Sequence, residues 1–323
     1  MLITGHTGFK GGWLSLWLSQ FGATVSGYAL PPEYPEGIYV AADIARRITP
    51  VAGDLKDRSR LRHCIELMRP NVIFHLAAQA LVRRAHADPL LTYMSNVMGT
   101  AEVLEAAKLS PFVQAVVVVT SDKVYDNRGE GRPFREGNRL GGMEPYGVSK
   151  AAAEMVIAAF RRERQGDGPA VASARAGNVI GGGDFGEDRL VPDAIRAFRA
   201  QAPLEVRNPN STRPWQHVLD PLAGYLMLAE RLIDGDPQWQ RGWNFGSESP
   251  EPVHELADEM VRLWNRAGLG EASWVSTADP DAPYEAKSLA LDSTDARERL
   301  GWQPRLRLSD ARGWTMDWYI AQS

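Results

Sequence analysis

The chain has 323 residues, with 36 Lys and Arg against 40 Asp and Glu, so its formal net charge is −4. This balance argues against a nucleic-acid or polyanion binder, which needs a surplus of basic residues. Hydrophobic residues make up 44% and charged residues 24%, which excludes a disordered or fibrous chain. With one Cys, no long apolar run and no charged-then-apolar leader, we expect a soluble, cytoplasmic protein.

The first half of the chain alternates short apolar runs with amphipathic stretches of helical length, a pattern that specifies parallel strands with crossover helices. Two of the apolar runs, 71–76 and 115–120, are too continuous for a half-exposed strand, so both faces of their sheet should be covered. We therefore expect an α/β fold with a doubly wound parallel sheet of the Rossmann type. Strands are expected near 2–4, 23–29, 48–52, 72–76, 114–120 and 170–176, and helices near 11–20, 57–68, 88–108 and 146–164.

After about residue 178 the composition shifts toward Gly, Pro and Asn turn signals, and eight of the ten Trp lie beyond residue 200. This change predicts a smaller, mixed C-terminal substrate domain. We expect residues 1–178 and about 214–247 to form the Rossmann domain, and about 179–213 and 248–323 the substrate domain. Helices are expected near 191–201, 220–233, 253–267, 293–300 and 309–321.

A glycine-rich segment, Thr4-Gly5-His6-Thr7-Gly8-Phe9-Lys10-Gly11-Gly12, lies between the first strand and the first helix. Glycines at 5, 8 and 11 let the backbone turn tightly and approach a pyrophosphate, which the free N–H groups of the helix then bind. We therefore expect a dinucleotide cofactor, the alternative being a plain strand-helix turn. The opening strand has only three residues, which suggests that the natural start lies upstream of Met1.

The second strand lacks the acidic residue that usually binds the adenosine ribose, since it ends Gly27-Tyr28-Ala29-Leu30-Pro31. The choice between NAD and NADP is therefore open, and Lys10 would add positive charge near the phosphates. Asp54, after the third strand, would reach the adenine amine or cap a helix.

Tyr146 and Lys150 lie four residues apart at the start of a predicted helix, so they share one face. On that face the ammonium would lower the phenol pKa and hold a ribose hydroxyl while the phenolate acts as a base on a sugar alcohol. The alternative is an ordinary surface pair.

Thr120-Ser121-Asp122-Lys123 follows the most apolar strand, and ligands of parallel sheets bind outside the carboxyl ends of the strands. A hydroxyl, a carboxylate and an amine at such an end form an acid-base set, although a solvated strand cap is the alternative.

Five strings occur in the order and spacing of one known family: Gly5-x-x-Gly8-x-x-Gly11, His75-Leu76-Ala77-Ala78-Gln79, Asn96-Val97-x-Gly99-Thr100, Thr120-Ser121-Asp122 and Tyr146-x-x-x-Lys150. Together they resemble extended short-chain dehydrogenase/reductases that act on nucleotide sugars. The longer strings at 5–11, 120–123, 175–184 and 213–218 resemble one group of that family, the CDP-glucose 4,6-dehydratases.

The resemblance implies a hydro-lyase that uses NAD, with NADP not excluded, and no metal. CDP-glucose would become CDP-4-keto-6-deoxyglucose for deoxysugar biosynthesis, such as that of lipopolysaccharide O-antigen. Tyr146 would take the 4-hydroxyl proton as C4 is oxidised, the C5 proton and C6 hydroxyl would leave as water, and hydride would return to C6. Ser121 would hydrogen-bond the C4 oxygen. Asp122 would protonate the leaving hydroxyl, which requires a pKa raised by burial.

Lys123 departs from the dTDP-glucose relatives, which carry a Glu as C5 base at this position. A lysine acts as a base only when it is neutral, and burial beside Lys150 and an oxidised nicotinamide would lower its pKa. We hypothesise that Lys123 is the C5 base, the alternative being that it only positions the substrate.

The resemblance also assigns binding residues. For the cofactor they are Gly5, Thr7, Gly8, Phe9, Lys10, Gly11, Asp54, Leu55, Leu76, Ala77, Ala78, Gln79, Asn96, Thr120, Tyr146 and Lys150. For the substrate they are Gln79, Asn178, Arg189, Leu190, Arg213 and Asn244. Asn178 would hold the pyrophosphate and the two arginines would meet phosphate or ribose. Arg189, near a helix start, and Asn244, in a turn, also have plain structural explanations.

The helices near 88–108 and 146–164 are rich in small residues, and in the family they form an intersubunit four-helix bundle. We therefore expect a homodimer, internal packing on the sheet being the alternative. Two other functions stay open. Another nucleotide-sugar dehydratase, a 4-epimerase or a decarboxylase would share the fold, although an epimerase needs no acid such as Asp122. A non-catalytic NAD(P)-binding regulator would not need Tyr146, Lys150 and Ser121.

Overall fold

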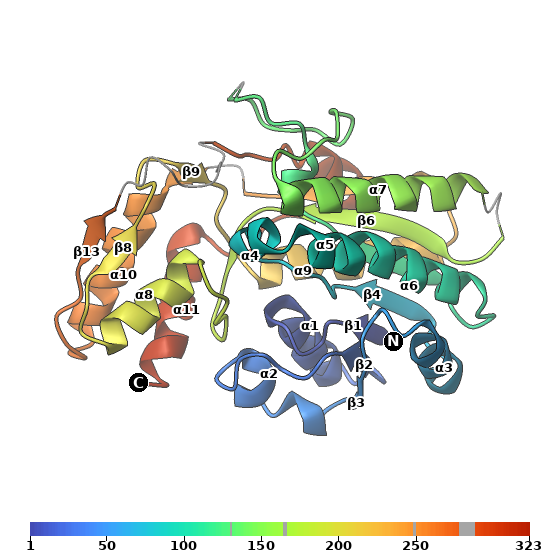
Figure 1. Ribbon diagram of the computed structural model, residues 1–323, viewed down its shortest axis with the longest axis horizontal. Coiled ribbons are helices and arrows are strands. Elements are labelled where there is room, and N and C mark those ends of the chain that lie inside the picture. Colours follow the sequence, from blue (N-terminus) through green and yellow to red (C-terminus); the bar gives the residue numbers. More distant parts are fainter. Residues whose placement is uncertain (130, 164–166, 248–249, 278–287) are drawn as a thin grey trace.

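The computed structural model describes the chain except residues 130, 164–166, 248–249 and 278–287. Its centre is a seven-stranded parallel sheet in the order β11-β6-β5-β4-β1-β2-β3, which confirms the expected doubly wound fold (Figure 1). The strands are β1 (Leu2–Thr4), β2 (Ser26–Ala29), β3 (Thr49–Ala52), β4 (Val72–His75), β5 (Ala115–Val119), β6 (Ala170–Ala176) and β11 (Gly242–Phe245). The strand order reverses between β1 and β4, and such a switch point opens a crevice for ligands.

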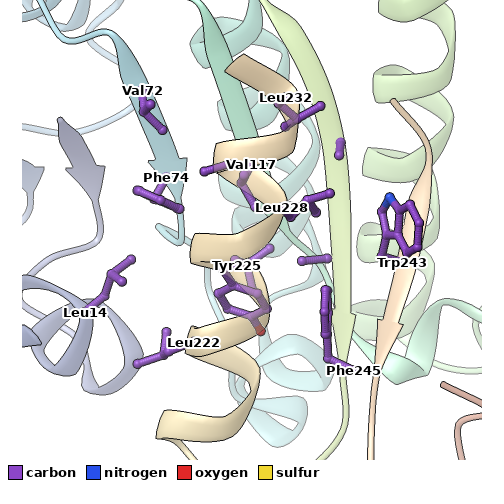
Figure 2. Close-up of a cluster of buried hydrophobic side chains, with 14 of the residues drawn as sticks. Leu14, Val72, Phe74, Val117, Leu222, Tyr225, Leu228, Leu232, Trp243 and Phe245 are labelled. Carbon is purple, nitrogen blue, oxygen red and sulfur yellow. The ribbon is translucent and has the colours of Figure 1, made fainter. Parts of the chain in front are cut away.

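Buried side chains alternate between the two faces of the sheet. In β4, Val72 and Phe74 face one cluster, with Leu14, while Ile73 faces the other, with Ile157. Figure 2 shows Leu222, Leu228 and Leu232 of helix α9 in the first cluster. Helices α1 (Phe9–Gln20) and α9 (Leu219–Ile233) cover that face, and α3 (Arg58–Met68), α6 (Gly99–Lys108) and α7 (Pro145–Glu163) cover the other.

The single helix expected over 88–108 is divided in the structure. Helix α4 (Val82–Ala87) comes first, and Asp88 then caps α5 (Pro89–Tyr93) by accepting a hydrogen bond from the N–H of Leu91 at 2.9 Å. A π-helical turn, η2 (Met94–Met98), joins α5 to α6. Turns of this type occur frequently at functional sites. Residue 164, the expected end of the next helix, lies outside the described part of the chain.

The C-terminal helices form a separate core cluster that contains Phe198, Trp264 and Tyr319. Its helices are α8 (Leu190–Arg199), α10 (Val253–Arg266) and α11 (Leu308–Ile320), beside the strand pair β8 (Leu204–Val206) and β13 (Trp274–Ser276). A π-helical turn, η5 (Ala296–Leu300), occupies most of the range expected as helix 293–300. The smaller elements are α2 (Ile38–Ala41), η1 (Ile44–Arg46), η3 (Asp122–Val124), η4 (Pro237–Trp239), β7 (Val179–Ile180), β9 (Thr212–Arg213), β10 (Gln216–His217) and β12 (Glu251–Pro252).

Strand β11 was read from the sequence as a turn. It pairs with β6 as the outer strand of the sheet, and a Cβ on Gly242 would lie 2.5 Å from the Arg175 guanidinium. Because segment 214–247 packs on the sheet through α9 and β11, we propose the two-domain division stated above; 248–249 and 278–287 fall outside the described residues. Within the described residues no helix is long and apolar enough to cross a bilayer.

Candidate active site

A cleft of about 1290 Å³ opens at the carboxyl ends of the strands and extends to the C-terminal helices. All but two of the site residues expected from the sequence line it. They are Gly5, Thr7, Gly8, Phe9, Lys10, Gly11, Asp54, Leu55, Leu76, Ala77, Ala78, Gln79, Thr120, Ser121, Asp122, Lys123, Tyr146, Lys150, Asn178, Arg189, Leu190 and Arg213. The fold therefore brings the three expected segments together.

The glycine-rich loop forms a turn that tolerates no side chain at two positions. Gly5 has φ +77°, and a Cβ there would lie 2.7 Å from the backbone nitrogen of Ala77. A Cβ on Gly11 would lie 2.1 Å from the carbonyl oxygen of Gly5. This close packing brings the N-terminus of α1 to the cleft, as pyrophosphate binding requires.

The residues beyond the second and third strands form one end of the cleft. Asp57, not Asp54, caps α3, since its side chain accepts a hydrogen bond from the N–H of Arg60 at 3.0 Å. The Asp54 carboxylate accepts one from the N–H of Lys56, also at 3.0 Å, and lines the cleft. The helix-cap alternative for Asp54 was therefore wrong.

The catalytic candidates after β5 lie at the short turn η3: Ser121 caps it, and Asp122 and Lys123 lie within it. Ser121 donates to Asp122 Oδ1 at 3.0 Å and accepts from the N–H of Lys123 at 3.2 Å. Asp122 is 3% exposed, and its Oδ2 has no hydrogen-bond partner among the described residues. Burial raises the pKa of Asp122, against the opposing charges of Lys123, Lys10 and Arg213. The direction is the one that a general acid requires.

Tyr146 and Lys150 share one face of α7, and both are buried. The Lys150 ammonium donates to the carbonyl of Val119 at 3.0 Å, and burial lowers its pKa to about 8. Burial raises the pKa of Tyr146 to about 12. The hydrogen bond with Ser121 lowers this pKa, but by less than burial raises it. The sequence predicted a lowered phenol pKa, so that expectation was wrong for the protein alone: desolvation, with the Asp122 and Glu144 charges, outweighs the Ser121 hydrogen bond and the Arg189 charge.

Four expected substrate residues lie on the C-terminal side of the cleft. Arg189 directly precedes Leu190, the first residue of α8, and Asp184 accepts a hydrogen bond from its guanidinium at 2.8 Å. Arg213 is 4% exposed, and its charge acts on Asp122. Asn178 follows β6 and lines the same wall.

Two expected residues do not line the cleft. Asn244 is fully buried in β11, where its amide donates to the carbonyls of Phe134 and Asp292 and accepts from the Tyr125 hydroxyl at 2.6 Å. Its side chain has no free group to turn toward a nucleotide, so we withdraw it as a direct substrate contact. Asn96 lies in the π-helical turn, and its side chain contacts Gln79, a residue that lines the cleft.

Asn96 exchanges two hydrogen bonds with the backbone of Gln79, at 2.8 and 2.9 Å, and donates a third to Ser149 of α7. It therefore fixes the cleft wall at Gln79 against the helix that carries Tyr146 and Lys150. The Gln79 side chain donates a hydrogen bond to the Thr92 hydroxyl and accepts one from the N–H of Leu81.

A buried ion pair beneath the cleft was not identified from the sequence. Glu154 lies four residues after Lys150 and accepts two hydrogen bonds from Arg175, at 2.8 and 2.9 Å, one from Thr120 at 2.6 Å and one from Ser173 at 2.7 Å. The pair ties α7 to β5 and β6 directly behind the catalytic candidates. The signals in the sequence were a glutamate among alanines on the Tyr146–Lys150 face and, 21 residues later, an arginine in an apolar strand.

Comparison with known proteins places these features in one family. The family model of GDP-mannose 4,6 dehydratase matches residues 2–312. The CDP-glucose 4,6-dehydratase of Salmonella typhimurium is 43% identical over 99% of this chain and 90% of its own length. The dTDP-glucose 4,6-dehydratase of Xanthomonas campestris is 26% identical over 84% of this chain and 78% of its own length.

Solved structures show the same fold. A Thermus thermophilus UDP-glucose 4-epimerase in complex with NAD aligns with a TM-score of 0.86 at 21% identity, covering 100% of this chain and 99% of that one. A Bacillus anthracis dTDP-glucose 4,6-dehydratase in complex with NAD aligns with a TM-score of 0.82 at 20% identity, covering 100% and 96%.

Proposed function

Because the chain belongs to the GDP-mannose 4,6-dehydratase family, we propose that it is an NAD-dependent CDP-glucose 4,6-dehydratase, a hydro-lyase that forms CDP-4-keto-6-deoxyglucose. One observation carries the proposal. A buried carboxyl with a raised pKa, Asp122, lines the same cleft as Tyr146 and Lys150, so an acid for water loss accompanies the groups for sugar oxidation.

The cleft fits a dinucleotide. The backbone turn that Gly5 and Gly11 allow opens the N-terminus of α1 to a pyrophosphate, and Asp54 and Leu55 line the end where an adenine would lie. When bound, NAD would supply the hydride acceptor for oxidation of the sugar and the hydride donor for its later reduction, and a positive nicotinamide beside Tyr146 would lower the pKa of that phenol. Leu30, Pro31 and Pro32 follow β2 directly, without the acid that usually binds the adenosine ribose there, so NADP stays an alternative cofactor.

Tyr146 and Ser121 would act on the C4 oxygen. Ser121 lies between the Tyr146 phenol and the Asp122 carboxyl, with hydrogen bonding to both. With a pKa of about 8, the Lys150 amine is largely protonated at neutral pH and can hold a ribose hydroxyl. Tyr146 thus takes the O4 proton while Ser121 fixes the oxygen.

Asp122 and Lys123 would carry out the elimination. Once C4 is a ketone, the C5 proton is acidic, and an amine at Lys123 can remove it while Asp122 protonates the leaving C6 hydroxyl. Since burial raises its pKa, Asp122 keeps its proton to a higher pH than an exposed aspartate does. A 4-epimerase needs no such acid, and a non-catalytic regulator needs none of these groups.

The substrate would lie against the C-terminal wall. Asn178 would hold the pyrophosphate, and Arg189 and Arg213 would bind phosphate or ribose, with Gln79 and Leu190 beside them. The cytosine preference is supported by the 43% identity to the Salmonella enzyme.

A panel of substrates tests the proposal. The protein is incubated with CDP-, dTDP-, UDP- and GDP-glucose in deuterated water, and the products are analysed by mass spectrometry. We expect loss of one water and gain of one deuterium at C5 from CDP-glucose, and none with Tyr146→Phe. Reaction of another nucleotide sugar in its place would overturn the base assignment, and no reaction at all would overturn the dehydratase.

We also propose a homodimer through α5, α6 and α7. The outer surface of these helices and the π-helical turn exposes large apolar side chains, Leu90 at 74%, Met94 at 47%, Met98 at 46% and Met155 at 58%. Such patches mark protein interfaces.

The single cysteine, Cys64, is buried and free, which suits the cytoplasm. There the product would supply deoxysugar biosynthesis such as that of O-antigen.

A further inference from the structure

Residues 181–184, Gly-Gly-Gly-Asp, join the two sides of the cleft through three positions that admit no side chain. A Cβ on Gly181 would lie 2.9 Å from Val218, one on Gly182 would lie 2.1 Å from Trp318, and one on Gly183 would lie 2.6 Å from Ile38. Ile38 begins α2 and lines the cleft, whereas Trp318 lies in α11, one of the C-terminal helices. The glycines therefore form a close junction between the cofactor side and the C-terminal helices.

Two hydrogen bonds attach the junction to the cofactor side. Trp13 Nε1 donates to the carbonyl of Gly182 at 2.9 Å, and the N–H of Ile38 donates to the carbonyl of Gly183 at 3.1 Å. Trp13 lies in α1, directly after the glycine-rich loop, and Ile38 itself lines the cleft. The position of the junction is thus set by elements that a bound dinucleotide would contact.

Asp184 attaches the other end of the junction to the substrate side. Its Oδ2 accepts from Arg189 Nη1 at 2.8 Å, its Oδ1 accepts from the N–H of Gly186 at 3.0 Å, and its carbonyl accepts from the Tyr319 hydroxyl at 2.6 Å. The Arg189 charge in turn acts on Tyr146, so the guanidinium lies within electrostatic reach of the reacting centre. Asp184 therefore orients an arginine that faces the cleft.

We propose that residues 181–184 couple the two sites: a dinucleotide that fixes α1 and the segment before α2 also fixes Gly182 and Gly183, and through Asp184 it orders Arg189 for the substrate diphosphate. Asp184 is a positioning residue in this scheme. The inference rests on the proposed function for the identity of the two ligands. Because coupling of this kind is reciprocal, each ligand tightens the other by the same factor.

Calorimetric titration measures the coupling without turnover. CDP is titrated into the protein with and without saturating NAD, and NAD is titrated with and without CDP. We expect NAD to tighten CDP binding about fivefold or more in the wild type, with the same ratio in the reciprocal titration. Gly183→Ala displaces the backbone of Ile38 and should bring both ratios close to one.

Gly22→Ala is the matched control. Gly22 has φ +77° against +78° for Gly183, but within the described part of the chain no atom lies within 4 Å of its added Cβ, so it carries the backbone strain without the contact. Its coupling ratio should equal that of the wild type. Trp13→Phe removes the hydrogen bond to Gly182 and keeps an aromatic ring, which gives a second test if Gly183→Ala unfolds. Asp184→Asn should weaken CDP binding more than it changes the affinity for NAD alone, on which Asp184 acts only through its charge on Lys10.

The outcomes separate this inference from the proposed function. If CDP binds and Gly183→Ala or Trp13→Phe couples as strongly as the wild type, the junction is overturned and the function stands. If UDP, dTDP or GDP binds in place of CDP and the coupling is lost in the variants, the base assignment fails and the junction stands. If no nucleotide binds, or if wild-type NAD and nucleotide affinities are independent, the coupling is refuted.

Discussion

Replacement of Glu154 by Gln should destabilise the fold far more than loss of an exposed ion pair. Glu154 accepts four hydrogen bonds from three residues and is 2% exposed. A glutamine has one acceptor oxygen, so the Arg175 guanidinium would keep its buried charge without a counterion. Breaking a buried pair in this way costs about 3–5 kcal/mol. At about 1.5 °C per kcal/mol for a chain of this length, this lowers Tm by roughly 4–8 °C.

Thermal unfolding at pH 7 measures the effect, with Glu102→Gln as the control. Glu102 also binds an arginine through two hydrogen bonds, but its partner Arg58 is largely exposed, so little change in Tm is expected. The double variant Glu154→Leu with Arg175→Met removes both charges and should recover part of the loss. Equal Tm values for Glu154→Gln and Glu102→Gln would refute the reasoning.

The pH dependence of the same difference follows from the charge of Glu154. Its hydrogen bonds and the Arg175 charge outweigh the effect of burial and hold its pKa below the ordinary value of 4.5. A carboxyl with a lowered folded-state pKa stabilises the fold above its unfolded pKa and loses that contribution as the pH falls. The Tm difference should therefore be complete at pH 7 and decrease below about pH 4.5.

Three further changes test the site and the assembly. Asp122→Asn should slow water loss by about 10²–10⁴-fold. In the wild type kcat should fall as the pH rises through the raised pKa of Asp122, because a general acid acts only while protonated, and the Asn variant should lose this fall. Measurement of kcat against pH tests both expectations. Lys123→Met should abolish exchange of the C5 hydrogen with deuterated water, and exchange at the wild-type rate would exclude Lys123 as the base. Lys123→Arg keeps the charge but should lose turnover, because arginine cannot be deprotonated. Leu90→Asp with Met155→Asp should convert a dimer to a monomer by light scattering, and a monomeric wild type would contradict the dimer.

The fold was predictable because its central strands are continuously apolar. Strand β5 is buried along its whole length, and the glycine-rich segment identifies β1 although that strand has only three residues. Strand β11 was missed because Trp243-Asn244-Phe245 contains a polar residue at its centre. Only the tertiary fold shows that the Asn244 amide is satisfied by Tyr125, Phe134 and Asp292.

The site was predictable where function depends on spacing along the chain, as for Tyr146 and Lys150. Contacts between distant segments were not predictable. Glu154 pairs with Arg175, 21 residues away, at no recognisable spacing, and the raised pKa of Tyr146 follows from desolvation that only the packed structure reveals. The pattern of apolar residues in a single sequence predicts which strands and helices are buried. It does not predict how far one polar side chain in a cleft is shielded from solvent.

The fate of the hydrogen at C4 tests the central claim most directly. CDP-glucose labelled with deuterium at C4 is converted in ordinary water, and the product is analysed by NMR. Dehydration within one bound molecule predicts that the deuterium moves to C6 of the same sugar, while C5 acquires hydrogen from the solvent. A product without the label, or a deuterium that stays at C4 of an epimerised sugar, would contradict the account.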